Sequence, residues 1–218
     1  MKYKAVIFDL DGTIVDTEHI WRSATLTLIA NKGFVLNADM RHELQQQLQG
    51  LAIHKSCKII KDLTQTEDSV EDLMAEKVKI ASSLYKGGVQ FIPGFVEFHA
   101  KVQQTSLKYG VATNADDVTL KTTDEALQLR RFFGEHLYNI SCVAHVCKPN
   151  PAIYLYVADK LGVHPRDCIA IEDSAHGIAA AKDAGMTCIG INTARDERQL
   201  VRADSIIQSY DEIDLQQW

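Results

Sequence analysis

The sequence predicts an α/β protein whose mainly parallel sheet is interrupted early in the chain by a block of helices. From residue 93 onward, short apolar runs that suit buried strands alternate with amphipathic segments, which is typical of βαβ units with right-handed crossovers. The segment from residue 16 to residue 88 instead carries helical periodicity without a strand signal. We therefore expect a core formed by residues 1–15 and 89–218 and an inserted all-helical unit formed by residues 16–88.

Composition sets limits on the class of protein. The chain has 218 residues, 46% of them hydrophobic and 24% charged, which suits a soluble globular protein with a sizeable core. A net charge of −6 gives no electrostatic footprint for nucleic acid. Neither a signal peptide nor an apolar run of about 18 residues is expected. Five cysteines without a Cys-x-x-Cys pair predict free thiols in a reducing cytoplasm. For the oligomeric state, a monomer is the default expectation.

The first predicted strand ends in a pair of carboxylates. Val6, Ile7 and Phe8 form a short β-branched and aromatic run, and Asp9 follows where a parallel strand would emerge from the sheet. Asp11 comes two residues later, and Gly12 allows a sharp turn or a close approach of the backbone to a ligand. Carboxylates in this position suit a hard divalent cation such as Mg²⁺. The plainer alternative is that two acids begin a solvated loop.

Four amphipathic segments fill the helical block. Asp16 or Thr17 can cap the first, and Asn37 can cap the second, which ends before Gly50. The remaining predicted helices cover approximately residues 52–63 and 70–84. Linkers at 12–15 and 86–90, the second of them with two glycines, would let the block move as a lid that excludes water. A fixed subdomain that only adds stability is the alternative.

The second half of the chain is read as alternating helices and strands. Asn150 and Pro151 form a strong helix start, and Gly162 ends that helix. A weaker strand signal covers residues 138–141. The other predicted elements are helices at 94–106, 116–129 and 175–184, and strands at 109–114, 168–171 and 187–191, the first of which runs into polar residues.

Further polar residues follow the predicted strands. Thr113 ends one strand, where its hydroxyl and the start of the next helix would hold a phosphate oxygen, although a turn-forming role fits the residue equally well. Lys148 lies beside two prolines that restrict its backbone, although a lone lysine is normally a solvated charge. Glu172 and Asp173 end another strand, where capping of the next helix is the alternative reading.

These four elements together resemble the motifs of the haloacid dehalogenase superfamily of phosphohydrolases and phosphomutases. The matches are Asp9-Leu10-Asp11-Gly12-Thr13, then Thr113-Asn114, then Lys148, and finally Asp173-Ser174-Ala175-His176-Gly177-Ile178 preceded by Glu172. Their order along the chain is that of the family, and they cover residues 6–191. The resemblance implies a Rossmann-like three-layer core with an inserted helical cap, in the subgroup of phosphoglycolate phosphatases and β-phosphoglucomutases.

The resemblance also implies a mechanism and a set of site residues. Asp9 would be the nucleophile that forms an aspartyl-phosphate, and Asp11 would be the general acid and base. The phosphate would be bound by Thr113, Asn114 and Lys148. The cofactor Mg²⁺ would be bound by Asp9, Asp11 through its backbone carbonyl, Glu172 and Asp173. The implied activity is that of a phosphoric monoester hydrolase acting on a small phosphorylated metabolite, of sugar phosphate or phosphoglycolate type.

Other activities remain open at this point. A β-phosphoglucomutase shares the aspartyl-phosphate but has a cap histidine twelve residues after the nucleophile, where this chain has Trp21, and His19 would need a shifted register. Dehalogenases lack the second aspartate that Asp11 supplies. A non-catalytic phosphate-binding regulator is a further alternative. In the predicted cap, His54 and Lys55 are candidate substrate contacts, although solvated positions suit them as well.

Overall fold

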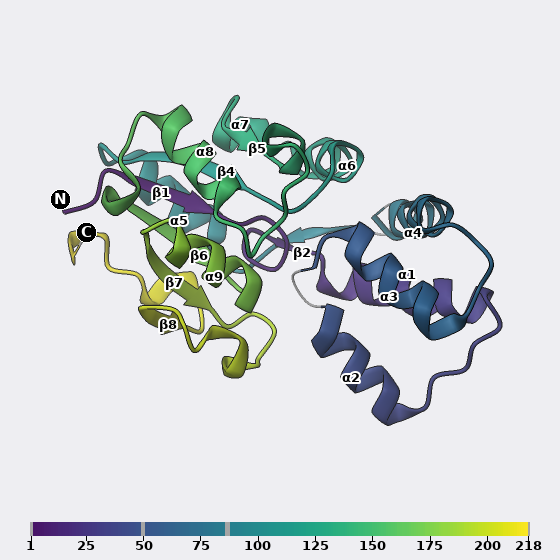
Figure 1. The fold of residues 1–218 in the computed structure, drawn as a ribbon. Helices are drawn as coiled ribbons and strands as arrows, with labels where there is room; N and C mark the ends of the chain where they lie inside the picture. The colour runs from purple at the N-terminus through teal and green to yellow at the C-terminus, as the bar shows by residue number, and fades with distance from the viewer. Residues whose placement is uncertain (1, 49–50, 86–87, 218) are drawn as a thin grey trace.

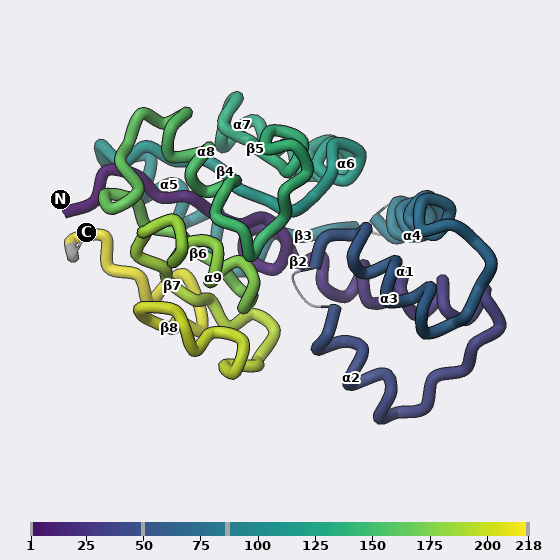
Figure 2. Tube along the Cα trace, in the orientation of Figure 1, coloured from purple at the N-terminus to yellow at the C-terminus, as the bar shows by residue number. Residues whose placement is uncertain are grey.

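The structure, a computed structural model, describes residues 2–48, 51–85 and 88–217. Figure 1 shows a core of sheet and helices and, beside it, the four helices α1–α4, which we call the cap. Figure 2 follows the chain from the core into the cap at β2 and back into the core at β3. Lys86 and Gly87 of the second predicted linker, and Gly50, before which the second predicted cap helix ends, lie outside the described residues.

Six strands form the sheet of the core, in the order β5-β4-β1-β6-β7-β8, and all the pairings between them are parallel. This confirms the Rossmann-like fold with a mainly parallel sheet. A separate antiparallel pair, β2 with β3, connects the core to the cap. The strands are β1 (Ala5–Phe8), β2 (Val15–Asp16), β3 (Gln90–Phe91), β4 (Lys108–Ala112), β5 (Leu137–Tyr138), β6 (Cys168–Glu172), β7 (Thr187–Ile191) and β8 (Ser205–Ile207).

Helices cover both faces of the sheet, because side chains along a strand alternate between its two faces. Val6 and Phe8 of β1 join an apolar cluster with α5 and α7, whereas Ala5 and Ile7 join a cluster with α8 and α9. The core therefore has three layers. Its helices are α5 (Phe95–Gln103), α6 (Asp117–Leu127), α7 (Arg130–Phe133), α8 (Ala152–Leu161) and α9 (Ala175–Asp183).

The cap consists of four helices with an apolar cluster of their own. This cluster includes Leu28, Leu44, Ile60 and Leu73, one from each helix. The helices are α1 (Glu18–Asn31), α2 (Ala38–Leu48), α3 (Ile53–Thr64) and α4 (Val70–Tyr85). The division of the chain into a core of 1–15 and 89–218 and a cap of 16–88 stays a prediction.

Local capping is partly as the sequence predicts. Asn37 accepts a hydrogen bond from the backbone N–H of Met40 at 2.8 Å, which confirms its predicted capping of α2. Thr17 occupies the N-cap position of α1 but makes no side-chain capping bond, so capping by its hydroxyl is wrong. Its hydroxyl instead donates to Asp11 Oδ1 at 2.6 Å.

Two predicted boundaries shift in the structure. The weak strand predicted at 138–141 ends at Tyr138, because Asn139 begins a 3-10 turn by accepting from the backbone N–H of Ser141. Helix α8 begins one residue later than predicted, with Pro151 as its N-cap. The 3-10 turns are η1 (Ile140–Val143), η2 (Pro165–Asp167), η3 (Glu197–Leu200), η4 (Tyr210–Glu212) and η5 (Leu215–Gln217). None of the helices in the described ranges is long and apolar enough to cross a membrane.

Candidate active site

The candidate site lies at the carboxyl ends of three neighbouring strands, β4, β1 and β6. In the parallel register, Phe8 lies opposite Val111 on one side and Ile171 on the other. Asp9 therefore follows its strand at the level where Glu172 ends β6 and where β4 leads into Thr113. Ligands bind at this edge of open α/β sheets.

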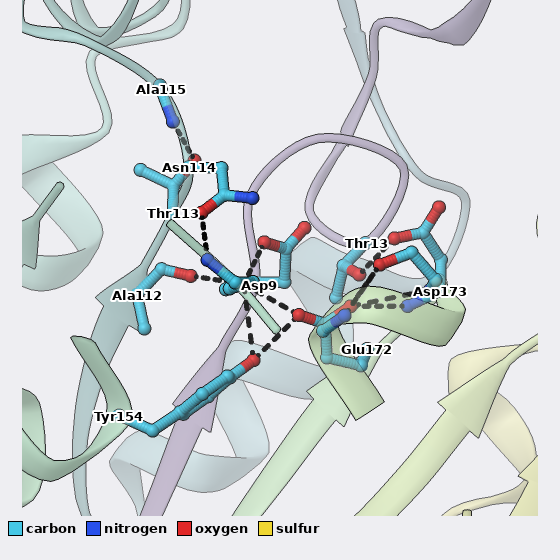
Figure 3. A network of polar contacts seen from close by, with 12 residues as sticks. Asp9, Thr13, Ala112, Thr113, Asn114, Ala115, Tyr154, Glu172 and Asp173 are labelled. Atoms are coloured by element: carbon cyan, nitrogen blue, oxygen red, sulfur yellow. Dashed lines mark hydrogen bonds and ion pairs between the residues drawn. The ribbon is translucent and has the colours of Figure 1, made fainter. Parts of the chain in front are cut away.

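Lys148 joins the carboxylates that emerge from two of these strands. Its Nζ lies 2.5 Å from Asp9 Oδ1 and 2.6 Å from Glu172 Oε1, and it also donates to the carbonyl oxygen of Ala112 at 2.8 Å. Tyr154 of α8 donates its hydroxyl to the same Glu172 oxygen at 2.8 Å. Figure 3 shows the Tyr154 hydroxyl pointing toward the Glu172 carboxylate. Lys148 is thus a buried, fully engaged cation at the base of the site.

Three carboxylates form an acidic cluster around this lysine. Carboxylate oxygens of Asp9, Glu172 and Asp173 all lie within 4.8 Å of one another. Both oxygens of Glu172 are engaged, since Oε2 accepts from the Asp173 backbone N–H and from the Ser174 hydroxyl, each at 3.2 Å. Thr13 donates to Asp173 Oδ1 at 3.4 Å. Asp9 and Asp173 therefore have the more available oxygens.

The cluster carries more negative charge than Lys148 can balance. Burial raises the pKa of Asp9, and the neighbouring Glu172 charge raises it further against the opposing effect of Lys148. Burial and the charges of Asp9 and Glu172 hold the pKa of Asp173 well above its usual range. A divalent cation would relieve this repulsion, and oxygen ligands suit Mg²⁺. The residues therefore fit a hard cation bound chiefly by Asp9 and Asp173.

Two glycines make room for these carboxylates. Gly12 has a φ of +84°, and a Cβ there would lie 2.2 Å from Asp173 Oδ2. A Cβ on Gly177, in the first turn of α9, would lie 1.7 Å from Glu172 Oε1. A side chain at either position would therefore displace a carboxylate of the cluster, which agrees with the close approach that the sequence predicts for Gly12.

Asp11 lies beside the cluster, toward the cap. Thr17 donates to its Oδ1 at 2.6 Å, so the first residues of the cap orient this carboxylate. Burial raises the pKa of Asp11, while hydrogen bonds from Thr17 and Trp21 oppose the rise. Its carboxylate is not part of the close group formed by Asp9, Glu172 and Asp173. This position suits proton transfer better than binding of a metal by the side chain.

Thr113 and Asn114 form the wall of the cavity on the side of β4. The Thr113 hydroxyl accepts from the backbone N–H of Ala115 at 3.0 Å, and Asn114 Oδ1 accepts from the backbone N–H of Lys148 at 2.8 Å. In Figure 3, Thr113 and Asn114 lie in the segment that directly follows β4. Both residues line the same cavity as Asp9. The structure therefore brings the predicted phosphate-binding residues together, although their function stays a prediction.

A cavity of about 360 Å³ extends from the acidic cluster into the cap. From the core it is lined by Asp9, Asp11, Gly12, Thr113, Asn114, Ala115, Asp116, Thr119, Lys148, Asp173 and Ser174. From the cap it is lined by Thr17, Glu18, Trp21, Arg22, Thr25, Leu26, Arg41, Leu44, Gln45, Leu48, Leu51, Ala52, Ile53, Ser56 and Lys77. This size suits a small-molecule ligand.

The structure does not bring His54 and Lys55 to this cavity. Both side chains are exposed and neither belongs to its lining, although Ile53 and Ser56 on either side do. On a helix, neighbouring positions point in different directions, so residues 53 and 56 share a face that 54 and 55 do not. Substrate contact by His54 and Lys55 stays a prediction that this geometry does not favour.

Sequence reasoning missed two polar residues that the structure places beside the cluster or in the cavity. Helical periodicity alone places Tyr154 on the apolar face of its helix, but its hydroxyl donates to Glu172. Lys77 is buried and lines the cavity from α4. A charged residue between Leu73 and Ala81, both on the apolar face of that helix, was a signal in the sequence that could have identified it.

Comparison with known proteins adds independent findings. The family model described as "Haloacid dehalogenase-like hydrolase" matches residues 6–191. Hexitol phosphatase B of Escherichia coli (strain K12) is 31% identical over 216 residues, which cover 96% of this chain and 93% of that protein. The phosphorylated carbohydrates phosphatase of Thermotoga maritima is 27% identical over 209 residues, which cover 93% of this chain and 92% of the relative.

Solved structures agree on the fold. The crystal structure of CbbY from Rhodobacter sphaeroides in complex with phosphate has a TM-score of 0.81 at 25% identity, covering 96% of each chain. A β-phosphoglucomutase from Clostridium difficile has a TM-score of 0.78 at 23% identity, covering 99% of this chain and 95% of that chain. The second similarity concerns the fold alone.

Proposed function

Since the chain is a phosphoric monoester hydrolase that belongs to the haloacid dehalogenase-like hydrolase family, we propose that it hydrolyses a small sugar phosphate or phosphoglycolate-type metabolite through an aspartyl-phosphate on Asp9. The observation that carries the proposal is the position of Asp9. It lies at a strand end, against Lys148 and Asp173, and lines a cavity of metabolite size.

In the first step, an Asp9 carboxylate oxygen bonds to phosphorus while the bond from phosphorus to the substrate oxygen breaks. Asp11 gives its proton to the departing alkoxide, so an alcohol leaves. Lys148 fixes the orientation of Asp9 through the contact at Oδ1 and offsets the charge of the transferring group. Thr113 and Asn114 bind the phosphate oxygens from the wall on the side of β4.

In the second step, Asp11 takes a proton from water as the water oxygen attacks phosphorus. The bond from phosphorus to Asp9 then breaks, which releases inorganic phosphate and restores the free carboxylate. Thr17 keeps Asp11 in position through its hydrogen bond. The cap restricts bulk water at the cavity, because twelve side chains of α1–α4 line it, together with Thr17 before α1 and Leu51 and Ala52 before α3.

Mg²⁺ is the cofactor we propose. It would be bound by the carboxylates of Asp9 and Asp173 and by the backbone carbonyl of Asp11, with Glu172 supporting the site indirectly through Lys148 and Ser174. When bound, it supplies charge neutralisation for the phosphate.

The position of Trp21 does not favour a mutase. Trp21 lines the cavity, where β-phosphoglucomutases have a cap histidine. His19 is the histidine nearest to Trp21 in the sequence. Its Nδ1 lies 3.5 Å from Asp16 Oδ1, 53% of its side chain is exposed, and it does not line the cavity. A hydrolase that returns the phosphoryl group to water fits this arrangement better.

The test is phosphate release from a panel of hexose phosphates, hexitol phosphates, phosphoglycolate and nucleoside monophosphates, with and without Mg²⁺. We expect release that requires Mg²⁺ and that falls at least about 10³-fold in Asp9→Asn. Asp16→Asn is the matched control, because Asp16 is half exposed and does not line the cavity. Full activity of Asp9→Asn, or isomerisation of hexose phosphates without release, would overturn the proposal.

A further inference from the structure

A second polar region lies at the cap end of the cavity, remote in sequence from the acidic cluster. Lys77 occupies the buried stripe of α4 between Leu73 and Ala81, each four residues away. Its side chain is 4% exposed, and it lines the cavity. A lysine at such a position needs an explanation, because lysine is almost never fully buried without a partner.

The surroundings of Lys77 do not neutralise its charge. Among the described residues, Ser56 is the one hydrogen-bond partner of Nζ, at 3.0 Å, and no carboxylate lies within ion-pairing distance. The Ser56 hydroxyl already donates to the Ile53 carbonyl oxygen at 2.9 Å, so it accepts from Lys77. An ammonium has three donors, and this arrangement uses one of them. Burial lowers the pKa of Lys77 to about 8, so it remains a cation at neutral pH.

The amino end of α3 lies at the same end of the cavity. Its N-cap is Ala52, which provides no capping side chain, and its first turn contains no acidic residue. Leu51, Ala52, Ile53 and Ser56 line the cavity here. The first N–H groups of a helix are unpaired within the helix and favour a negatively charged ligand. This feature and the Lys77 ammonium therefore favour the same kind of group.

The wall between the two ends of the cavity has few groups that could balance the positive charge of Lys77. It is formed largely by apolar side chains, among them Trp21, Leu26, Leu44 and Leu48. The acidic residue that lines the cap side, Glu18, accepts a hydrogen bond from Gln45 at 2.9 Å. A ligand that brings its own negative oxygen would satisfy the free donors of Lys77.

We propose that Lys77, Ser56 and the amino end of α3 form a binding site for a second anionic group of the substrate, a carboxylate or a second phosphate. The substrates would then be phosphate monoesters with an anionic group at their other end. This inference rests on the proposed function, in which the transferred phosphate binds at the acidic cluster. Lys77 here determines specificity and does not take part in bond breaking.

The experiment compares matched ligands that differ in one group. The acids are phosphoglycolate, 3-phosphoglycerate and 6-phosphogluconate, and the corresponding alcohols are 2-hydroxyethyl phosphate, glycerol 1-phosphate and sorbitol 6-phosphate. A hexose 1,6-bisphosphate against its 1-phosphate tests the second anion source. Binding is measured by calorimetry in an Asp9→Asn background, where turnover is blocked, and phosphate release is measured with Asp9 intact.

We expect at least one anionic ligand to bind about tenfold tighter than its neutral partner, a difference of about 1.4 kcal/mol. Lys77→Met should abolish that preference, and Lys79→Met, on an exposed position of the same helix, should keep it. The pair that shows the preference identifies carboxylate or phosphate as the group.

Equal affinity within every pair, or a preference that survives Lys77→Met, would overturn the inference. These outcomes are independent of turnover. Absence of phosphate release from every compound would instead contradict the proposed function, while a binding preference lost in Lys77→Met would still support the anion site.

Discussion

Two buried lysines at opposite ends of one cavity have opposite surroundings. Lys148 is 2% exposed and contacts two carboxylates, whereas Lys77 is 4% exposed and contacts one hydroxyl. Burial alone would lower the pKa of Lys148, but Asp9 and Glu172 raise it above the usual range, whereas burial lowers the pKa of Lys77. The core therefore supplies partners for its cation. The cap leaves its cation available, which is what binding of an external anion requires.

Removal of Lys148 should have the largest effect. Lys148→Met leaves Asp9 and Glu172 buried without their cation, and breaking a buried ion pair costs about 3–5 kcal/mol of folding free energy. The loss of a charge-stabilising donor should also lower kcat/KM by about 10²–10³-fold. Urea denaturation and phosphate release measure the two effects.

Lys121→Met is the control for this comparison, because Lys121 is 76% exposed and makes one long surface ion pair with Glu125. A Lys148→Met protein as stable as the control would contradict the assignment of Lys148 as the counterion of the cluster.

Removal of Lys77 should have the opposite effect on stability and raise the free energy of unfolding. Lys77→Met replaces an uncompensated buried charge with an apolar side chain of similar length and should raise the free energy of unfolding at pH 7 by about 2 kcal/mol. Below pH 8 the lysine is protonated in both states, so the folded protein carries the full cost of burial. Between pH 8 and 10.5 the folded state releases the proton first, and stability rises with pH.

The difference in free energy of unfolding between Lys77→Met and the unsubstituted protein should therefore decrease as the pH rises from 8 toward 10.5. Parallel denaturation series of the variant and the unsubstituted protein measure it. A variant that is less stable at pH 7 would show that Lys77 has a stabilising partner in the cap, and the contrast with Lys148 would disappear.

A third buried base extends the comparison, because it does not line the cavity that Lys148 and Lys77 share. His99 lies among aromatic rings including Phe95, Tyr109 and Phe133. Neither of its ring nitrogens has a hydrogen-bond partner among the residues that the structure describes. Burial lowers its pKa to about 4. As the pH falls from 6.5 to 4, the unfolded state binds a proton that the folded state excludes, so stability decreases.

His99→Phe should remove this acid-dependent loss and, at pH 7, stabilise the fold by about 1 kcal/mol by removing two unpaired polar atoms. The measurement is the free energy of unfolding at pH 7 and pH 5 for both proteins. If the free energy of unfolding falls equally in both proteins between pH 7 and pH 5, His99 does not titrate as described.

A further prediction concerns the Tyr154 hydroxyl, which contacts Lys148 and Glu172. Tyr154→Phe removes the 2.8 Å bond to Glu172 and should cost about 1–2 kcal/mol of stability, with a several-fold lower kcat. Tyr156→Phe, two residues away on the same helix and partly exposed, is the control. Equal behaviour of the two variants would assign Tyr154 to packing alone.

Much of the fold was predictable, because local patterns determine it. The β-branched runs gave the strands β1, β4, β6 and β7, and the helical periodicity of the cap gave α1–α4. Pairing of Asn139 with Ser141, which ends β5, depends on a single side-chain bond and was not predictable from periodicity. Helix α7 is one turn long, which is too short for a periodic signal.

The site was predictable where residues follow strands. Asp9, Thr113 and Glu172 lie together because parallel strands end at one edge of the sheet. The partners of Thr17 and Tyr154 depend instead on how helices approach the sheet, which no local pattern encodes. Lys77 was not predicted, because one charged residue within an apolar stripe does not by itself indicate a function. Its significance follows from the cavity that it lines.

The most direct test of the account is a rapid acid quench of the enzyme during turnover of its best substrate with Mg²⁺, followed by peptide mass spectrometry. The account predicts one phosphoryl group on the peptide that contains Asp9 and none in the same peptide from Asp9→Asn. Phosphate release in a single turnover with that peptide unmodified, or with the phosphoryl group on another residue, would contradict it.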